Sequence, residues 1–240
     1  MELLELTLGN STADVALDEA LLEDAEANDN AVEVLRLWEP REPTVVLGRS
    51  SSFVNEINAE ACETRGVKVV RRCSGGATIL TSPGCLMYAV LLSYEKRPEL
   101  RMIDNAHQFV LSQIKNAIAA CDVECQIQGI SDLTVGGQKV SGNALRCKRK
   151  WLIYHGTLIC QSMDLELIGE CLGQPGRQPD YRQRRSHTDF LTRLPLTTSE
   201  LSQALIRQWK CASQMKTWPE ELTNQLVADK YSQSKWTKKV

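Results

Sequence analysis

The sequence predicts an α+β fold in which helices flank a mixed and mostly antiparallel sheet. Segments with the two-residue period of strands recur along the first 160 residues, and amphipathic segments separate them without a regular strand–helix–strand alternation. A glycine pair, Gly136-Gly137, separates two strand-like segments, which is typical of a hairpin and therefore of antiparallel pairing. After residue 161 the pattern becomes mainly helical. These observations favour a domain built around one such sheet.

The N-terminal elements are predicted from alternation and capping. Residues 3–8 alternate weakly and indicate a short strand. Ser11 is then expected to cap a helix, with Asp14 at the reciprocal position of a capping box. The apolar stripe expected on this helix consists of Ala13, Leu17, Ala20 and Leu21.

The remaining elements are predicted from the helical period of about 3.6 residues and the strand period of two. Residues 102–120 show the clearest helical stripe in the chain, and a short helix near 57–65 is expected to end at Gly66. Strands are predicted at 32–38 (half-buried), 44–47, 67–70, 86–93 (buried on both faces), 131–135, 138–145 and 151–160. After a loop at 173–186, helices are predicted at about 198–212 and 219–230, and residues 236–240 are expected to fray.

Composition and charge argue against several classes of function. A net charge of −2 gives no reason to expect binding of nucleic acid, and the basic runs 146–150 and 182–185 are short. No apolar run approaches the ~20 residues of a membrane-spanning helix, and the first residues lack the pattern of a signal peptide. The nine cysteines lack C-x-x-C spacing and do not pair with the three histidines as zinc ligands do. We therefore expect a cytoplasmic protein with free thiols.

The first candidate site is the segment 71–79, R-R-C-S-G-G-A-T-I, which follows a predicted strand. Two adjacent glycines allow the backbone to approach a ligand closely and to point amides at anionic oxygens. Arg72 lies just before them and can bind a phosphate or a carboxylate. The segment is not a Walker A loop, because Gly-Lys-Ser/Thr does not follow, and a glycine pair taken alone is more typical of a tight turn than of a ligand site.

Two further candidates lie on the later strands. Lys139 has small neighbours within 138–145, so its ammonium could reach into a pocket and neutralise charge on an acyl phosphate, although a solvent-facing lysine fits the same pattern. Asp132 could be an exposed turn residue, or a partner for that ammonium or for magnesium. His155, which precedes a glycine, could orient a substrate or fill a polar position in the core.

Taken together and in order, four motifs resemble those of the lipoate–protein ligase family, which is related to the octanoyltransferases and biotin–protein ligases. They are R-R-C-S-G-G-A at 71–77, G-x-S-D-L-x-V at 129–135, K-V-S-G-N-A-x-R at 139–146 and H-G-T-L at 155–158. The resemblance extends upstream to 35–49 and to D-E-A-L-L at 18–22, and it covers about residues 10–160. A later run, 179–190, is similar to shorter ligase-like members but indicates no role.

The resemblance implies a ligase catalytic domain of the class II synthetase-like type. Such an enzyme forms lipoyl-AMP from lipoate and ATP, and then transfers the lipoyl group to a lysine of a lipoyl-domain or H-protein-like acceptor. Lys139 would be the catalytic residue, because a fixed ammonium stabilises the pentavalent phosphorus state of the first step and the oxyanion of the second. Mg²⁺ would accompany the ATP, with Asp132 as its ligand.

The resemblance also implies which residues contact each substrate. The ATP or adenylate site would comprise Arg72, Ala77, Thr78, Ile79, Leu80, Asp132 and Lys139. The lipoate site would comprise Leu17, Trp38, Arg49, Gly75, Gly76, Gly142, Ala144 and His155. Apolar wall is expected from Leu17 and Trp38, because an acyl chain gains roughly 0.8 kcal/mol for each CH₂ that it buries.

The chain departs from the family pattern in two places. Ala77 stands where many ligases have a third glycine. Residues 1–196 correspond to the catalytic domain, and 197–240 are expected to form a helical appendage packed on it, too short for the additional C-terminal domain of many ligases. A separate accessory subunit could therefore complete adenylation, or the chain could use ready-made acyl donors.

Two alternatives stay open at the level of sequence. A cysteine-dependent octanoyltransferase of the same fold would need a thiolate near Lys139, and Cys125 and Cys171 are its main candidate nucleophiles. A non-catalytic module that binds lipoate or a nucleotide would keep Arg72 and the glycines without needing Lys139. Biotin is a less expected substrate, because the glycine loop differs from that of biotin ligases.

Overall fold

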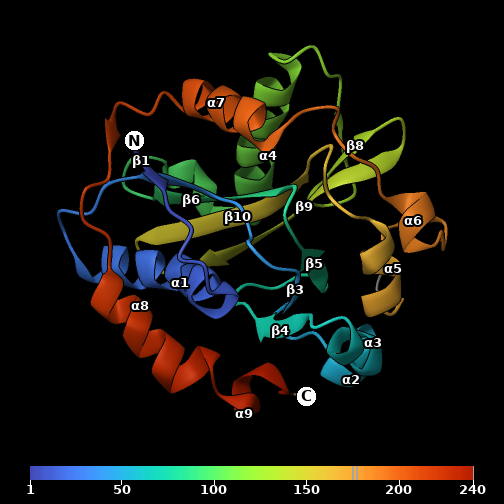
Figure 1. Ribbon diagram of the computed structural model, residues 1–240. Coiled ribbons are helices and arrows are strands. Elements are labelled where there is room, and N and C mark those ends of the chain that lie inside the picture. The colour runs from blue at the N-terminus through green and yellow to red at the C-terminus, as the bar shows by residue number, and fades with distance from the viewer. Residues whose placement is uncertain (175, 177, 240) are drawn as a thin grey trace.

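The computed structural model describes residues 1–174, 176 and 178–239. At its centre lies an eight-stranded mixed sheet (Figure 1). Its strands, in spatial order, are β11 (Ser213–Gln214), β1 (Glu2–Glu5), β2 (Val34–Trp38), β6 (Cys85–Ser93), β10 (Trp151–Ile159), β9 (Gln138–Cys147), β8 (Asp132–Val135) and β7 (Gln126–Gln128). The pairs β11–β1 and β1–β2 are parallel and the other neighbours are antiparallel, which confirms the predicted fold class.

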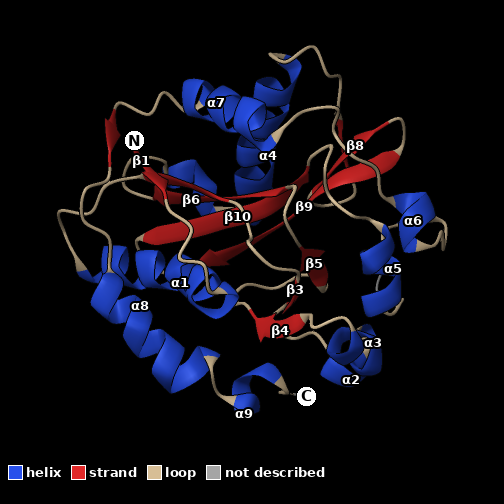
Figure 2. Cartoon of the chain, in the orientation of Figure 1, coloured by secondary structure: helices blue, strands red, loops and turns tan. Residues whose placement is uncertain are grey.

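A smaller sheet stands beside the large one. Its three strands are β4 (Lys68–Arg71), β3 (Thr44–Leu47) and β5 (Ile79–Thr81), with β3 in the middle. Val45, Leu47 and Leu80 share a buried apolar cluster with α3 (Ala59–Thr64) and α5 (Glu166–Cys171). The short helices α2 (Phe53–Glu56) and α6 (His187–Phe190) lie in the same part of the molecule (Figure 2).

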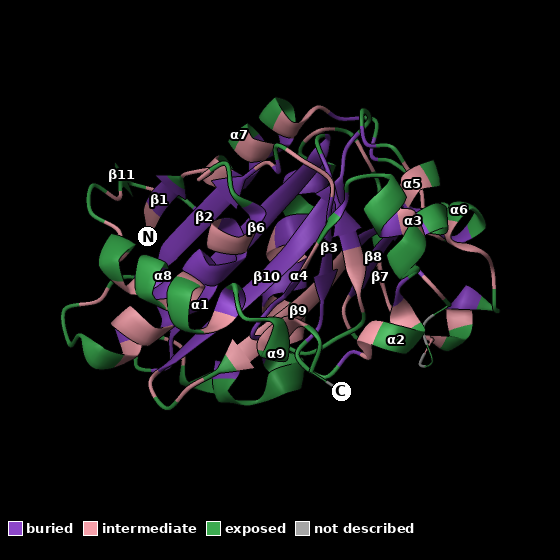
Figure 3. Ribbon diagram, turned by 60° about the horizontal axis from the view of Figure 1, so that its bottom comes forward, coloured by how far each residue is buried: buried purple, intermediate pink, exposed green. Residues whose placement is uncertain are grey.

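Helices cover both faces of the large sheet, whose central strands β2, β6 and β10 are buried along their whole length (Figures 1 and 3). On one face, α4 (Ile103–Ala119) and α7 (Thr198–Gln208) share a core with the inner strands. On the other face, α1 (Ser11–Ala27) packs against β10, and α8 (Glu220–Leu226) covers α1. α9 (Ser234–Thr237) lies beside β4.

Several local predictions are confirmed for the physical reasons that suggested them. Gly136 and Gly137 turn between β8 and β9 with φ of 57° and 78°, the left-handed region that a mirror-image hairpin turn requires. The strand β6 is buried along its whole length. The apolar stripe of α4 is buried from Ala106 to Ile118, whereas Ile103 at its first turn stays exposed.

The start of α1 corrects the predicted capping. Asn10, not Ser11, caps the helix, because its side chain accepts a hydrogen bond from the amide of Thr12. Asp14 is not part of a capping box: it accepts a hydrogen bond from the amide of Leu8 and pairs with buried Arg36. Burial extends around most of the helix and includes acidic side chains, so a single apolar stripe describes it poorly.

Other elements depart from prediction where tertiary contacts decide the structure. β2 is buried on both faces, not half-buried, because α1 covers the face that was expected to meet solvent. The short strands β5 and β7 and the helix α2 are too short to give a periodic signal. Residues 236–239 do not fray, because Arg71 donates to the carbonyl oxygens of Thr237 and Lys239, both at 2.9 Å. Val240 lies outside the described residues.

Residues 197–239 contribute to both layers of the molecule. β11 extends the large sheet, α7 joins the core beneath α4, and α8 covers α1. The division into a catalytic unit at 1–196 and an appendage at 197–240 stays a prediction. Across the described residues, we find no helix with the length and apolarity needed to cross a membrane.

Candidate functional site

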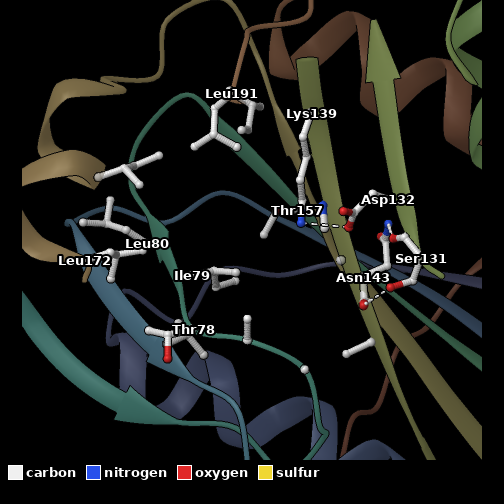
Figure 4. Close-up of a pocket in the computed structure, with 18 of the residues that line it drawn as sticks. Thr78, Ile79, Leu80, Ser131, Asp132, Lys139, Asn143, Thr157, Leu172 and Leu191 are labelled. Carbon is white, nitrogen blue, oxygen red and sulfur yellow. Dashed lines mark hydrogen bonds and ion pairs between the residues drawn. The ribbon is translucent and has the colours of Figure 1, made fainter. Parts of the chain in front are cut away.

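A cavity of about 760 Å³ lies between the small sheet and the strands β8, β9 and β10 (Figure 4). One wall is the end of the glycine loop with β5, from Gly76 to Leu80. The facing wall carries Asp132, Lys139 and His155. A cavity of this size and apolar lining suits a small-molecule ligand.

Lys139 extends from β9 into this cavity (Figure 4). Its Nζ atom lies 2.8 Å from Oδ1 of Asp132 on the neighbouring strand β8, and 22% of its side chain is exposed. Gly142 makes room for the ammonium, because a methyl group there would stand 2.9 Å from Nζ. The sequence motif thus places a lysine, a carboxylate and a glycine around one point of the cavity wall.

Arg72 is buried and shapes the glycine loop. Its Nε donates to Oγ of Ser74 at 3.0 Å, and its Nη2 donates to the carbonyl oxygens of Gly75 and Ala77. Gly76, with φ of 86°, lets the chain turn around the guanidinium, where a methyl group would approach Nη2 to 2.9 Å. Burial lowers the pKa of Arg72 to about 10, so it stays charged at neutral pH. The N–H groups of Arg72, which were expected to bind the nucleotide, therefore donate to atoms of the glycine loop and hold its shape.

The wall beyond the loop contains a carboxylate that sequence reasoning missed. Oε2 of Glu56, at the end of α2, accepts hydrogen bonds from the amide of Thr78 at 3.2 Å and from its hydroxyl at 2.6 Å. Burial tends to raise the pKa of Glu56, but hydrogen bonds from Thr78, Ser51 and Ser52 outweigh it, so the pKa lies below its usual value. One of the loop amides expected to meet a phosphate is therefore bonded to Glu56.

His155 links the cavity to the buried polar groups of α1. Its Nδ1 lies 2.7 Å from Oδ2 of Asp18, and its Nε2 lies 2.6 Å from Oγ of Ser74. Asp18 also accepts a hydrogen bond from Arg36 at 2.7 Å. The histidine is thus a satisfied polar group in the cavity wall, and it connects α1 to the glycine loop.

The end of the cavity away from Lys139 is apolar. Residues of four strands and α5 line it and belong to one buried cluster: Trp38, Leu80, Cys85, Met87, Ile159, Ile168 and Leu172. Trp38 lines the cavity as predicted, and Arg36 stands 5.0 Å from its ring centroid. This end suits a hydrocarbon chain, because each buried CH₂ contributes roughly 0.8 kcal/mol.

Most of the predicted site residues meet at this cavity. Those that line it are Trp38, Arg72, Gly76, Ala77, Thr78, Ile79, Leu80, Asp132, Lys139, Gly142, Ala144 and His155. Leu17, Arg49 and Gly75 are not among the lining residues. Leu17 is fully buried in the core between α1 and the sheet, and Arg49 and Gly75 are exposed. Val15 and Asp18 are the residues of α1 that reach the cavity.

Two further lining residues were missed by sequence reasoning. The Nδ2 group of Asn143 donates to the carbonyl oxygen of Ser131 at 2.7 Å, which ties β9 to the loop before β8. Tyr181, in the run 179–190 without an assigned role, donates its hydroxyl to Oδ2 of Asp132 at 2.7 Å. Asn143 belonged to a recognised motif, whereas nothing local in the sequence signals the contact of Tyr181.

The cavity thus combines an ammonium, a glycine loop and an apolar end, and a comparison with known families agrees with this arrangement. The sequence model described as the lipoyl protein ligase A/B catalytic domain matches residues 10–210, which is most of the chain. The chain belongs to this family. Since the matched model describes a catalytic domain, this member of the lipoyl protein ligase A/B family is an enzyme.

Curated relatives of this family member carry two kinds of name. A putative lipoate-protein ligase A of Aeropyrum pernix is 31% identical over 157 residues, which cover 65% of this chain and 56% of that protein. An octanoyltransferase LipM of Carboxydothermus hydrogenoformans is 26% identical over 251 residues, with 92% of both chains covered. The chain spans only about half, or less, of the length of several ligase relatives.

Solved structures share the fold of this family member. A bi-partite lipoate protein ligase of Thermoplasma acidophilum, described with its E2 lipoyl domain, superposes with a TM-score of 0.82 at 19% identity and covers 99% of this chain and 95% of its own. A structure of lipoate-protein ligase A bound with ATP gives a TM-score of 0.78 at 21% identity, with 99% and 98% covered. These neighbours confirm the ligase catalytic-domain fold.

The candidate nucleophilic cysteines of this family member are buried. Cys125 is buried in the core beneath α4, and burial raises the pKa of its thiol. Cys171 is buried between α5 and α3, and burial raises its pKa to about 12. Neither is among the cavity-lining residues, whereas Cys85 is, with its thiol pKa also raised by burial. A thiolate nucleophile would need a lowered pKa, so this environment opposes it.

The described residues offer a resident metal ion little support. They contain no group of three or more histidine, cysteine, aspartate or glutamate side chains placed to hold one. Both oxygens of Asp132 already have protein partners, Lys139 and Tyr181. The donor set therefore does not fit a magnesium site built by the protein, and we treat Asp132 as a partner of Lys139.

Proposed function

We propose that this protein is a lipoate–protein ligase that forms lipoyl-AMP from lipoate and ATP, and then transfers the lipoyl group to a lysine of a lipoyl-domain acceptor. The observation that supports this most is the position of Lys139, whose ammonium pairs with Asp132 in a cavity that the glycine loop and a cluster of apolar residues also line. The apolar residues suit the acyl chain, and the ammonium suits the charged acyl phosphate.

The proposed chemistry uses the ammonium of Lys139 twice. In the first step a lipoate carboxylate oxygen attacks the α-phosphorus of ATP and pyrophosphate leaves, while Lys139 stabilises the negative charge on phosphorus. In the second step the amine of the acceptor lysine attacks the acyl carbonyl, and AMP leaves as the amide forms. The oxyanion of this step lies within reach of the same ammonium, and the acceptor amine loses a proton.

The substrate sites follow from the two ends of the cavity. We assign the acyl chain to the end lined by Trp38, Met87 and Ile159, and the adenylate to the loop from Ala77 to Leu80. Arg72 acts here by holding the loop, since its donors are bonded to loop atoms. The name of the Thermoplasma neighbour includes an E2 lipoyl domain, which supports a lipoyl domain as acceptor.

The proposal is tested by incubating the protein with ATP, lipoate and a lipoyl domain, and searching by mass for lipoyl-AMP and for modified acceptor. Both products are expected from the wild-type chain, and Lys139→Ala should lower their rate by about 100-fold or more, because it removes the charge at the reacting centre. Wild-type activity that survives in Lys139→Ala would refute the assigned role. Products that appear only when a second ligase subunit is added would show that adenylation needs that subunit.

A cysteine-dependent octanoyltransferase is the second candidate, favoured by the LipM relatives that match 92% of the chain. It predicts acceptor modification from octanoyl carrier protein without ATP, and loss of that activity in Cys125→Ser, Cys171→Ser or Cys85→Ser. We expect these three variants to keep the ATP-dependent activity, because their thiols are buried and have raised pKa values. Octanoyl transfer without ATP that is present in the wild-type protein and lost in one of these variants, with an unchanged melting temperature, would favour the transferase.

A further inference from the structure

Residues 178–192, several of which line the cavity, are hydrogen-bonded to β9 at Gln138 and Lys139. The amide of Thr192 donates to the carbonyl oxygen of Lys139 at 3.0 Å. Nε2 of Gln138 donates to the carbonyl oxygens of Asp189 and Leu191, at 3.1 and 3.3 Å. We call residues 178–192 the crossing segment, since it passes over the cavity from Pro179 to Leu191.

Tyr181 of the crossing segment is connected to Lys139 through one carboxylate. Its hydroxyl donates to Oδ2 of Asp132 at 2.7 Å, while Oδ1 of the same carboxylate lies 2.8 Å from Nζ of Lys139. Rotation of Asp132 away from Lys139 would therefore break a second hydrogen bond. The long and flexible lysine side chain is thereby held at one place in the cavity.

The position of Tyr181 is itself fixed by packing. Its ring lies 5.3 Å from the ring of Phe190, and Cε1 would be only 3.4 Å from a methyl group at Gly129. The guanidinium of Arg185 donates to the carbonyl oxygen of Tyr181 at 2.9 Å and lies 5.3 Å from the Phe190 ring. Burial raises the pKa of Tyr181, so the phenol remains a hydrogen-bond donor at working pH.

We propose that Tyr181 is a positioning residue for the reaction, which orients Asp132 and through it holds the ammonium of Lys139 toward the acyl phosphate. This inference rests on the proposed function for the identity of the reaction. It gives a role to the run 179–190, whose residues line the cavity beside Lys139 without belonging to the recognised motifs. Tyr181 contacts neither substrate in this account and acts through Asp132.

The first test is independent of activity. The amine of Lys139 is labelled by reductive methylation, and its rate of modification is followed by mass spectrometry in wild type and in Tyr181→Phe. Removal of the hydroxyl should raise the labelling rate of Lys139 about threefold or more, because Asp132 loses the hydrogen bond that holds it against the ammonium. Equal rates in the two proteins would overturn the inference, whatever the reaction proves to be.

The second test uses the reaction and a matched control. Tyr181→Phe should lower kcat for acceptor lipoylation about tenfold with little change in KM for lipoate, because substrate contacts remain. Tyr154→Phe removes another hydroxyl, bonded to His107 at 2.9 Å on the α4 side of the sheet, and should leave kcat unchanged. Similar losses in both variants would show that removal of any buried hydroxyl lowers activity.

A double-mutant cycle separates positioning from general support of the fold. If Tyr181 acts through Asp132, the Tyr181→Phe change should have no further effect on kcat in an Asp132→Asn background. If the separate effects of Tyr181→Phe and Asp132→Asn on kcat multiply in the double variant, Tyr181 acts independently of Asp132 and the inference is overturned. A wild-type chain that forms neither lipoyl-AMP nor modified acceptor, even when a second ligase subunit is added, would refute the proposed function instead, and the labelling experiment would still decide the role of Tyr181.

Discussion

Around position 139, three residue types depend on one another. The ammonium of Lys139 needs a partner, which Asp132 supplies at 2.8 Å, and it needs space, which Gly142 supplies by having no side chain. Gly142 therefore matters for a steric reason, because its backbone φ lies outside the left-handed region. This explains why the K-V-S-G pattern carries chemistry that neither the lysine nor the glycine would carry alone.

Gly142→Ala tests this steric argument. The added methyl group would stand 2.9 Å from Nζ of Lys139 and would displace the ammonium, so kcat should fall by about tenfold or more while the fold is kept. Gly169→Ala is the matched control, because its methyl group would meet Thr188 at an ordinary 3.8 Å. Steady-state lipoylation and thermal melting distinguish the two. Full activity of Gly142→Ala would mean that the lysine does not need its observed position.

The glycine loop is supported by elements far from it in sequence. Arg71, at the end of β4, binds the carbonyl oxygens of Thr237 and Lys239, and Nε1 of Trp236 donates to the carbonyl oxygen of Arg71 at 2.9 Å. Arg146 of β9 donates to the carbonyl oxygen of Cys73 at 3.0 Å. Residues 236–239 therefore help to hold the strand from which the loop begins.

Trp236→Ala should loosen this support. We expect a loss of about 2 kcal/mol in the free energy of unfolding, since a half-buried indole and its hydrogen bond are removed. Hydrogen exchange should become faster at the amides of residues 71–77 as well as at 236–239. Lys235→Ala, an exposed neighbour, should change neither quantity. If exchange in 71–77 is unaffected by Trp236→Ala, the segment does not support the loop.

Among the helices and strands, the sequence predicts well those that have strong local signals. The hairpin at Gly136-Gly137, the strand β6 and the helix α4 follow from turn chemistry and hydrophobic period. The contacts of Arg72 and Tyr181 were not predictable, because each depends on partners that tertiary folding brings together. The family resemblance placed Leu17 in the acyl site, whereas Leu17 is buried in the core and Val15 and Asp18 of α1 line the cavity.

On the scale of the whole molecule, buried charge joins α1 to the large sheet. Arg36 of β2 is fully buried and pairs with Asp14 at 2.9 Å and Asp18 at 2.7 Å. Burial tends to raise the pKa of Asp18, but Arg36 and His155 outweigh it and hold the pKa below its usual 3.8. For Asp14, burial prevails and raises the pKa. Of the two aspartates that pair with Arg36, Asp18 is thus the one whose charge stabilises the fold.

The sign of the pH dependence follows from Asp18. A carboxyl with a lower pKa in the folded state stabilises the protein above its unfolded pKa, and this contribution is lost as pH falls through 3.8 toward the folded value. Asp18→Asn should therefore cost about 3 kcal/mol at neutral pH and should flatten the fall of unfolding free energy in acid. Urea denaturation across the acid range measures both. An unchanged acid slope would contradict this account.

The proposed chemistry requires the ammonium of Lys139 to stand beside the activated carboxyl group in the cavity. Binding of a stable lipoyl-adenylate analogue, in which a sulfamoyl group replaces the phosphoryl group, tests it most directly by calorimetry. Lys139→Ala should weaken binding by about 30-fold, since a charged hydrogen bond of roughly 2 kcal/mol is lost, whereas Cys171→Ser should bind as the wild-type protein does. Equal affinity of the wild-type and Lys139→Ala proteins would contradict it.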